Sequence, residues 1–371
     1  MKKIFFLIAA CIIMTAHGNN INCQLSTINC QLSTINCQLN INKHTDNNTL
    51  KIMYAKVKTE NGAPIADVAI KISGRPTYIT NDDGFFYFAA DNNQFTIERI
   101  EKTGYKLISP KLPYTATTDI NTLTIIMTLD EKPQQTSLRE YGQKLKDNAL
   151  QLESQRMYGD AADSLIKRAN LDTENVRWQI ETGMYMHKYG DYRTAQTFYN
   201  RAIKKAQELY GDNNQWLAEC YNLYGDNYFV WDPWGASGMT SSAMHFADAK
   251  TYYNYARSCW ISLLGEQCNA VANSYLYIGR CWRKLENDTM AMQCYEKALD
   301  ILKSLPNPDR NIESAVYVGQ THIYFNRNDY ASALSMLEKS LAIQKELYGE
   351  NSENYQAVMQ QIDKLKKIAN Q

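Results

Sequence analysis

The chain has 371 residues, which is long enough for two domains with flanking segments. Its 39 basic residues balance 39 acidic residues, so the formal net charge is +0 at pH 7. A chain without net charge lacks the strong basic field that attracts nucleic acids and anionic membrane surfaces. We therefore expect no nucleic-acid partner.

The first 18 residues have the layout of a secretory signal peptide. Two lysines precede an apolar run over residues 4–14, and Ala16-His17-Gly18 forms a small-x-small cleavage site. This pattern predicts export to the periplasm or the cell surface. The stretch Ile8-Ala9-Ala10-Cys11 also resembles a lipobox, in which Cys11 would carry a lipid and anchor the protein to a membrane such as the outer membrane. The sequence leaves both readings open.

Residues 19–49 are predicted to be a low-complexity tether. Residues 21–40 read INCQLST-INCQLST-INCQLN, so Ile and Leu recur every seven residues, as in a short coiled coil. Asn, Ser, Thr and Cys are weak helix formers, and no charged residue flanks the repeat. These features favour a solvated tether over an ordered helix.

Residues 50–129 show short alternating apolar runs that are typical of β-strands. Val68, Ile70 and Ile72 alternate with period two, and Asn61-Gly62 and Asp83-Gly84 are turn dipeptides. About seven such strands in 80 residues predict a seven-stranded type of β-sandwich. We expect a turn rather than a calcium loop at Asp83-Gly84, because oxygen ligands are not spaced around it.

This segment resembles the carboxypeptidase regulatory-like (prealbumin-like) domain. The likeness is carried by residues 80–86 together with Gly62-Ala63-Pro64-Ile65, Val68-Ala69-Ile70 and Gly104-Tyr105. Asn81 stands where that family commonly has Asp. The resemblance implies an accessory module without catalytic residues.

After a linker over residues 130–137, helical patterns run to the C-terminus. Ser137 and Glu140 fit a capping box, which predicts that the helices begin there. Gly183 and Gly225 lie 42 residues apart, as do Gly279 and Thr321. These small residues form one ladder, the glycine ladder. A second, alanine ladder consists of Ala195, Ala249, Ala291 and Ala333, which are 54, 42 and 42 residues apart.

Small residues that recur in phase on two helices predict stacked helical hairpins. Ala162, Ile166 and Ala169 extend the second-helix pattern to an earlier repeat, 33 residues before Ala195. The pattern thus predicts about five repeats in residues 138–371, followed by a closing helix over residues 354–368.

The helical region resembles the tetratricopeptide repeat family, in particular the longer repeats of kinesin light chain. The fourth repeat matches the signature of that family at Tyr275, Ile278, Gly279, Trp282, Ala291, Tyr295 and Ala298. The fold class we expect is therefore an α-helical solenoid behind a separate small all-β domain. The resemblance implies a concave groove, lined by the first helix of each hairpin, that binds a protein or peptide partner.

The irregular step of 54 places 12 extra residues between Gly225 and Ala249. We expect them within residues 230–245, in a loop that contains Trp231-Asp232-Pro233-Trp234, because proline interrupts a helix. Trp231 and Trp234 either pack on neighbouring repeats or contact a partner.

Counting from the signature glycines gives the expected groove residues. They are Met184, His187, Asn222, Asp226, Phe229, Leu276, Arg280, Arg283, Lys284, His322 and Phe325. Arg280, Arg283 and Lys284 lie within about one helical turn, where they can bind a carboxylate or an acidic segment. A solvated basic face explains the same three residues equally well.

The sequence contains no zinc-binding HExxH, no P-loop and no G-x-S-x-G motif. We therefore expect no catalytic residues, no metal site and no cofactor. The predicted function is an exported, non-enzymatic scaffold that binds a protein or peptide in the groove. The alternative is a surface protein that binds a glycan or another ligand through Trp231, Trp234 and the β-sandwich.

Overall fold

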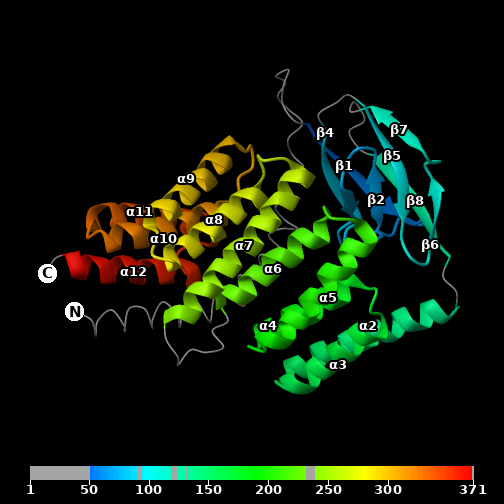
Figure 1. Cartoon of the computed structure of the whole chain (residues 1–371), viewed down its shortest axis with the longest axis horizontal. Helices are drawn as coiled ribbons and strands as arrows, with labels where there is room; N and C mark the ends of the chain where they lie inside the picture. The colour runs from blue at the N-terminus through cyan, green and yellow to red at the C-terminus, as the bar shows by residue number, and fades with distance from the viewer. Residues whose placement is uncertain (1–50, 91–93, 118–122, 131–132, 231–238, 370–371) are drawn as a thin grey trace. The chain divides into compact units, whose positions relative to one another are not determined.

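The computed structural model describes residues 51–90, 94–117, 123–130, 133–230 and 239–369 (Figure 1). The predicted signal peptide, the tether and Cys11 lie outside the described residues, as do Trp231 and Trp234. The chain divides at Glu266 into two compact units. Among the described residues, the unit that ends at Glu266 contains the strands and six helices, and the unit that begins at Gln267 contains five helices.

Eight strands in the described part of the chain form two four-stranded sheets, with the orders β4-β1-β8-β6 and β3-β2-β5-β7. They are β1 Lys51–Lys58, β2 Ala69–Ile72, β3 Thr77–Ile79, β4 Phe85–Ala90, β5 Gln94–Glu101, β6 Tyr105–Ser109, β7 Tyr114–Thr117 and β8 Leu123–Leu129. The expected seven-stranded arrangement is therefore not the one found. Strand β6 has no fully buried residue.

The two sheets pack against each other through aliphatic and aromatic side chains. Ile70 and Ile97 from one sheet and Ile125 from the other are fully buried. The ring of Phe88 in β4 meets the ring of Phe95 in β5 edge-on, with 4.9 Å between the centroids. A buried apolar core of this kind supplies most of the free energy that stabilises a small β-domain.

The dipeptide Asp83-Gly84 forms the predicted tight turn. Asn81 Oδ1 accepts hydrogen bonds from the backbone N–H of Asp83 (3.1 Å) and of Phe85 (2.8 Å). Gly84 has a φ of +75°, and a Cβ there would lie 2.3 Å from the carbonyl oxygen of Val57. The turn thus requires glycine at this position.

The first unit continues with three antiparallel helix pairs, α2/α3, α4/α5 and α6/α7. The bounds are α2 Pro133–Ser154, α3 Tyr158–Leu171, α4 Val176–Lys188, α5 Tyr192–Tyr210, α6 Gln215–Val230 and α7 Met239–Leu264. Helix α2 begins at Pro133, so the predicted capping box at Ser137 is wrong and Ser137 lies inside the helix. Proline is well suited to the first helical position, because its missing N–H would have no intrahelical partner there.

The second unit holds two further pairs, α8/α9 and α10/α11, and the final helix α12. The bounds are α8 Asn269–Lys284, α9 Asp288–Ser304, α10 Arg310–Asn326, α11 Tyr330–Tyr348 and α12 Glu353–Ala369. Helix α12 buries Val358, Ile362 and Leu365 in a cluster with residues of α11. None of the helices in the described part of the chain is long and apolar enough to cross a membrane.

A glycine packed under a tyrosine ring joins the two helices of three hairpins. A Cβ at Gly279 would lie 2.6 Å from Cε1 of Tyr295, closer than real Cβ contacts allow. The pairs Gly183 with Tyr199 and Gly225 with Tyr253 repeat the same geometry, at 2.6 and 2.7 Å. Glycine therefore recurs at these positions because a buried tyrosine ring leaves no room for a side chain.

The first hairpin uses a different register from the predicted one. The residues of α3 that are buried with the spacing of the alanine ladder are Ala161, Leu165 and Arg168. Ala162 and Ile166 are half-buried. The prediction over Ala162, Ile166 and Ala169 is thus wrong by one residue, although Ala169 itself is buried. Adjacent apolar pairs in α3 make the two registers equally compatible with the sequence pattern.

The predicted insertion loop is shorter than expected. Helix α6 ends at Val230 and α7 already begins at Met239, so residues 239–245 are helical rather than part of a loop. No Gly or Pro occurs between Met239 and Leu264, and the sequence there can continue a helix without interruption.

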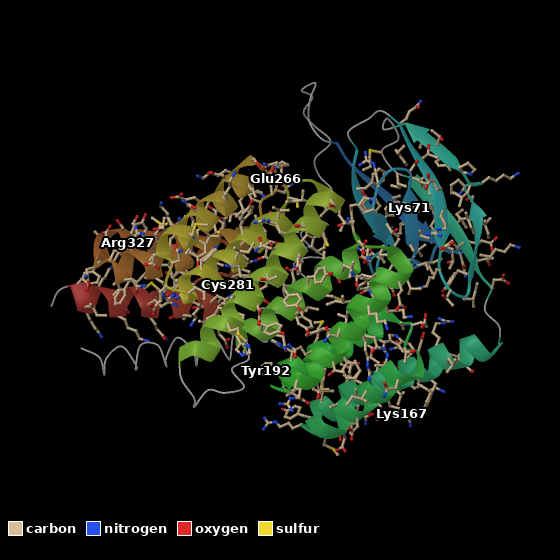
Figure 2. The ribbon with its side chains drawn as sticks, viewed as in Figure 1. Lys71, Lys167, Tyr192, Glu266, Cys281 and Arg327 are labelled. Atoms are coloured by element: carbon tan, nitrogen blue, oxygen red, sulfur yellow. The ribbon has the colours of Figure 1, made fainter. Side chains whose placement is uncertain are left out.

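The five cysteines in the described part of the chain are free and buried. They are Cys220, Cys259, Cys268, Cys281 and Cys294. Cys281 on α8, labelled in Figure 2, is fully enclosed. These thiols pack as small apolar side chains.

Candidate partner-binding site

The expected groove residues lie on the first helix of successive hairpins, and they fall in both units. Helices α4 and α6 carry Met184, His187, Asn222, Asp226 and Phe229. Helices α8 and α10 carry Leu276, Arg280, Arg283, Lys284, His322 and Phe325.

On α4, the side chain of His187 takes part in the packing of the hairpin. It is buried, and its Nδ1 lies 3.0 Å from Oδ1 of Asn227. The Nδ2 group of Asn227 in turn donates a hydrogen bond to the carbonyl of Tyr192 (3.0 Å). The imidazole also meets the ring of Tyr192 edge-on. These contacts orient the imidazole within the protein rather than toward a partner.

Asp226 and Phe229 on α6 also have internal contacts. The hydroxyl of Tyr253 donates a 2.6 Å hydrogen bond to Asp226 Oδ1, and the ring of Phe229 lies 5.4 Å from that of Phe246. Asn222 is 7% exposed, and its Oδ1 has no hydrogen-bond partner among the described residues. Met184 is half-buried against a hydrophobic cluster. Among the expected groove residues of this unit, Asn222 therefore has a side-chain oxygen that could accept a hydrogen bond from a partner.

The second unit contains a basic cluster, which we define as Arg280, Arg283 and Lys284 on α8 with His322 on α10. The guanidinium of Arg283 is close enough to Tyr295 to lower the pKa of that hydroxyl, although burial dominates and raises it. The Nε of Arg283 is buried and makes no hydrogen bond to any described residue. A buried donor without a partner costs about 1–3 kcal/mol, so this side chain is suited to an added acceptor.

The electrostatics of the basic cluster favour an anion. Burial, reinforced by the charges of Arg283, Lys284 and Arg280, lowers the pKa of His322 to about 3. His322 is therefore neutral near pH 7. Every charge that shifts this pKa is a cation, so the field at the imidazole is positive. A carboxylate placed there would oppose that field and raise the pKa of His322.

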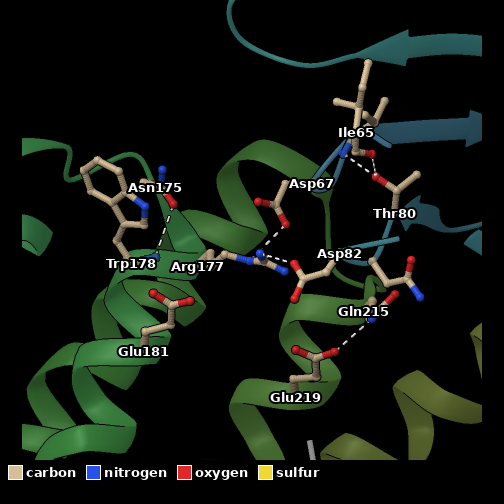
Figure 3. Close-up of polar contacts among 12 residues, drawn as sticks. Ile65, Asp67, Thr80, Asp82, Asn175, Arg177, Trp178, Glu181, Gln215 and Glu219 are labelled. Atoms are coloured by element: carbon tan, nitrogen blue, oxygen red, sulfur yellow. Dashed lines mark hydrogen bonds and ion pairs between the residues drawn. The ribbon is translucent and has the colours of Figure 1, made fainter. Parts of the chain in front are cut away.

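The structure also contains a polar junction that the sequence does not reveal. Arg177 at the start of α4 contacts Asp67 and Asp82 in two loops of the β-domain (Figure 3). These residues are about a hundred positions apart, and single-sequence patterns report only local spacing.

Comparison with known proteins gives one family match. Residues 322–354 match the tetratricopeptide repeat family, and they cover the end of α10, all of α11 and the start of α12. No curated protein matches the chain.

Several solved structures are similar to parts of the chain. BtubC (BKLC) from P. vanneervenii shares 19% identity over 65% of this chain and 91% of that one, with a TM-score of 0.40. MamA shares 16% identity over 53% of this chain and 95% of that one, with a TM-score of 0.37. A thermophilic TPR protein from Thermus thermophilus shares 12% identity over 61% of this chain and 99% of that one, with a TM-score of 0.42. The family match places a tetratricopeptide repeat at residues 322–354 of this chain.

Proposed function

We propose that this chain is an exported, non-enzymatic scaffold whose helical hairpins bind a protein or peptide partner. The observation that carries the proposal is the basic cluster of α8 and α10, in which Arg283 holds a buried donor without a partner. Hairpin arrays of this kind present extended surfaces built from successive first helices, and such surfaces bind peptides.

The chemistry of the cluster specifies the partner segment. Arginine guanidinium groups bind carboxylates through paired, charge-assisted hydrogen bonds. Leu276 is buried within its hairpin and the ring of Phe325 packs on that of Tyr330, so the charged positions are what this surface offers a partner. An extended segment that carries Asp or Glu therefore fits this surface better than a purely apolar helix does.

Binding of acidic peptides tests this proposal. The full mature chain would be titrated with peptides of about 12 residues, long enough to span several helical turns, that are rich in Asp and Glu, and with matched peptides that carry Asn and Gln. We expect the acidic peptides alone to bind, and Arg280→Ala with Arg283→Ala to weaken binding at least about tenfold, because charge-assisted hydrogen bonds contribute about 1.5–3 kcal/mol each. A peptide carboxylate should also raise the pKa of His322, measured from its imidazole proton resonances.

The matched control is Arg327→Ala. Arg327 is exposed just after α10, and no affinity change is expected from its removal. Equal binding of acidic and amidated peptides, or an unchanged affinity after removal of Arg280 and Arg283, would contradict the proposed site.

Export and anchoring form part of the same proposal. The apolar N-terminal segment supports secretion, and two processed forms are compatible with it. We expect the intact mass of the mature protein to correspond to cleavage after Gly18. A mass that contains a diacylglycerol group on Cys11 would instead establish a lipid anchor, and retention of residues 1–18 would contradict export through a cleaved signal.

For the β-domain we propose the role of an accessory module of the carboxypeptidase regulatory-like type. Its two packed sheets and the glycine turn at Gly84 support that assignment. Removal of the module should leave the affinity for acidic peptides unchanged if it acts as a spacer. A loss of binding would show that it contributes to recognition.

A further inference from the structure

The tyrosine of the α8/α9 hairpin has a buried hydroxyl without a hydrogen-bond partner. Tyr295 is fully buried, and its hydroxyl makes no hydrogen bond to any described residue. One edge of its ring faces Gly279 on α8, and its tip faces α10, where a Cβ at Gly319 would lie 2.9 Å from the hydroxyl oxygen. Burying a hydroxyl that makes no hydrogen bond costs free energy, so this group is suited to an added acceptor.

The α6/α7 hairpin shows what such an acceptor can be. There the equivalent hydroxyl, on Tyr253, donates a 2.6 Å hydrogen bond to Asp226 Oδ1. Asp226 directly follows Gly225, the glycine over which the ring of Tyr253 packs. A carboxylate that comes from the position after the glycine therefore reaches the tyrosine hydroxyl without disturbing the contact between glycine and ring.

The α8/α9 hairpin has a cation at the corresponding position. Arg280 follows Gly279 in the same way that Asp226 follows Gly225. A guanidinium group carries hydrogen-bond donors and no acceptor, so Arg280 cannot accept the hydroxyl proton of Tyr295. This hairpin thus has the buried tyrosine but lacks the carboxylate that satisfies it in the α6/α7 hairpin.

A second buried donor without a partner lies near this hydroxyl. Arg283 is one helical turn after Gly279, on the same face of α8, and its Nε makes no hydrogen bond to any described residue. Burial raises the pKa of the Tyr295 hydroxyl and the charge of Arg283 opposes that rise, so the guanidinium lies close to the hydroxyl. After burial, Arg283 also has the largest effect on the pKa of His322, three residues beyond Gly319 on α10. The two donors and the imidazole therefore lie around one region between α8 and α10.

We propose that the Tyr295 hydroxyl and the Arg283 Nε bind one carboxylate of the partner, which takes the place that the Asp226 carboxylate has in the α6/α7 hairpin. The inference rests on the proposed function, and it adds Tyr295 as the residue that selects the ligand. Each of the two donors gives one hydrogen bond, and the two oxygens of a carboxylate accept them. The side-chain amide of Asn or Gln has one oxygen and brings two further donors, so Asp and Glu are preferred.

The carboxylate reaches the buried hydroxyl from the side of the basic cluster. Arg280 and Arg283 are half-buried and Lys284 is exposed, so these three side chains lie partly in solvent. Arginine and lysine carry their charge at the end of a flexible stem. Rotation of these side chains around an incoming carboxylate therefore opens the path to Tyr295 without a rearrangement of the helices.

Tyr295→Phe tests the role of the hydroxyl, because it keeps the ring that packs against Gly279 and Gly319. In the free protein the hydroxyl has no partner among the described residues, so its removal should leave the urea midpoint of the second unit unchanged or raise it. Binding of an acidic peptide should weaken about tenfold, because a hydrogen bond to a charged acceptor is lost. A tyrosine with a purely structural role would not give these two effects together.

The experiment titrates the full chain with an acidic peptide and with peptides in which one Asp or Glu at a time is replaced by Asn or Gln. One of these replacements should weaken binding to the unmodified chain about tenfold and have little further effect on Tyr295→Phe, since both changes remove the same hydrogen bond. The matched control is Tyr253→Phe, which removes the hydrogen bond to Asp226. It should lower the urea midpoint of the first unit and leave the peptide affinity unchanged.

This inference and the proposed function can fail separately. If acidic peptides do not bind the unmodified chain, the proposed function is wrong and this inference is wrong with it. If they bind through Arg280 and Arg283 but Tyr295→Phe keeps the full affinity, the proposed function stands and the role of Tyr295 is overturned. A fall in the urea midpoint of Tyr295→Phe as large as that of Tyr253→Phe would also overturn it, because the hydroxyl would then already be hydrogen-bonded in the free protein.

Discussion

Replacing Tyr295 by alanine is expected to lower the free energy of unfolding of the second unit by about 3–5 kcal/mol, the usual cost of removing a large buried ring. The side chain is 0% exposed, and it packs between two helices. A Cβ at Gly279 on one side or at Gly319 on the other would lie 2.6 Å from ring atoms of Tyr295. Neither glycine has a side chain that could move into the space left by the ring.

Urea unfolding, with hydrogen exchange in α8 and α10 to assign the change to this unit, measures the effect. The control is Tyr348→Ala, since Tyr348 is 47% exposed and donates a hydrogen bond to Asn311. That variant should lose about 1 kcal/mol or less. Equal losses in the two variants would show that the ring of Tyr295 does not stabilise the unit in the way its burial indicates.

The same ring explains why the helix opposite needs glycine. Gly279→Ala should cost about 1–3 kcal/mol in the unmodified chain, because the added methyl group overpacks the interface. In a Tyr295→Leu background the same change should cost much less, so the two effects should not add. Additive losses would mean that Gly279 is present for a reason other than the tyrosine.

The glycine and alanine ladders make the hairpins predictable because each ladder position has a single physical requirement. A tyrosine ring on one helix excludes any side chain at Gly183, Gly225 and Gly279, and that exclusion is visible as a fixed spacing. The predicted register of α3 is wrong, since Ala161-Ala162 and Leu165-Ile166 satisfy both alternatives. A spacing argument fails where neighbouring residues are chemically alike.

The candidate site shows a different limit. Helical spacing predicts the position of His187 and Asp226 on the first helices, but it does not show that Asn227 and Tyr253 contact their side chains. The junction at Arg177 depends on contacts between segments that are distant in sequence. Only the folded chain brings Asp67 and Asp82 to that guanidinium.

A second large loss of stability is expected when Arg168 is replaced. This residue occupies the position that the small residues Ala202 and Ala256 have in later hairpins. Its side chain is almost fully enclosed, pairs with Glu181, and stacks 4.5 Å from the ring centroid of Trp178. Trp178 fits there because Gly142 on α2 has no side chain: a Cβ would lie 2.1 Å from Cη2 of the indole. The first hairpin is thus packed by a tryptophan and an arginine instead of a tyrosine.

Arg168→Ala should destabilise the first unit by about 3 kcal/mol, the lower end of the usual cost of breaking a buried ion pair, because Lys146 still pairs with Glu181. Burial alone would raise the pKa of Glu181, and Arg168 and Lys146 together hold it below its usual value. Without Arg168, Lys146 remains at 2.9 Å as the partner of Glu181, and the pKa of Glu181 should rise. Urea unfolding and hydrogen exchange in α3 measure the loss.

Changing both members of the pair separates charge from packing. Arg168→Met keeps an apolar side chain beside Trp178 but leaves Glu181 with Lys146 as its cation. Most of the loss of stability should therefore remain. Adding Glu181→Gln removes the buried charge as well, and the double variant should recover most of the stability, because buried ion pairs are often replaceable by uncharged groups. If the double variant is as unstable as Arg168→Ala, the guanidinium stabilises the hairpin through its contact with Trp178 rather than by neutralising Glu181.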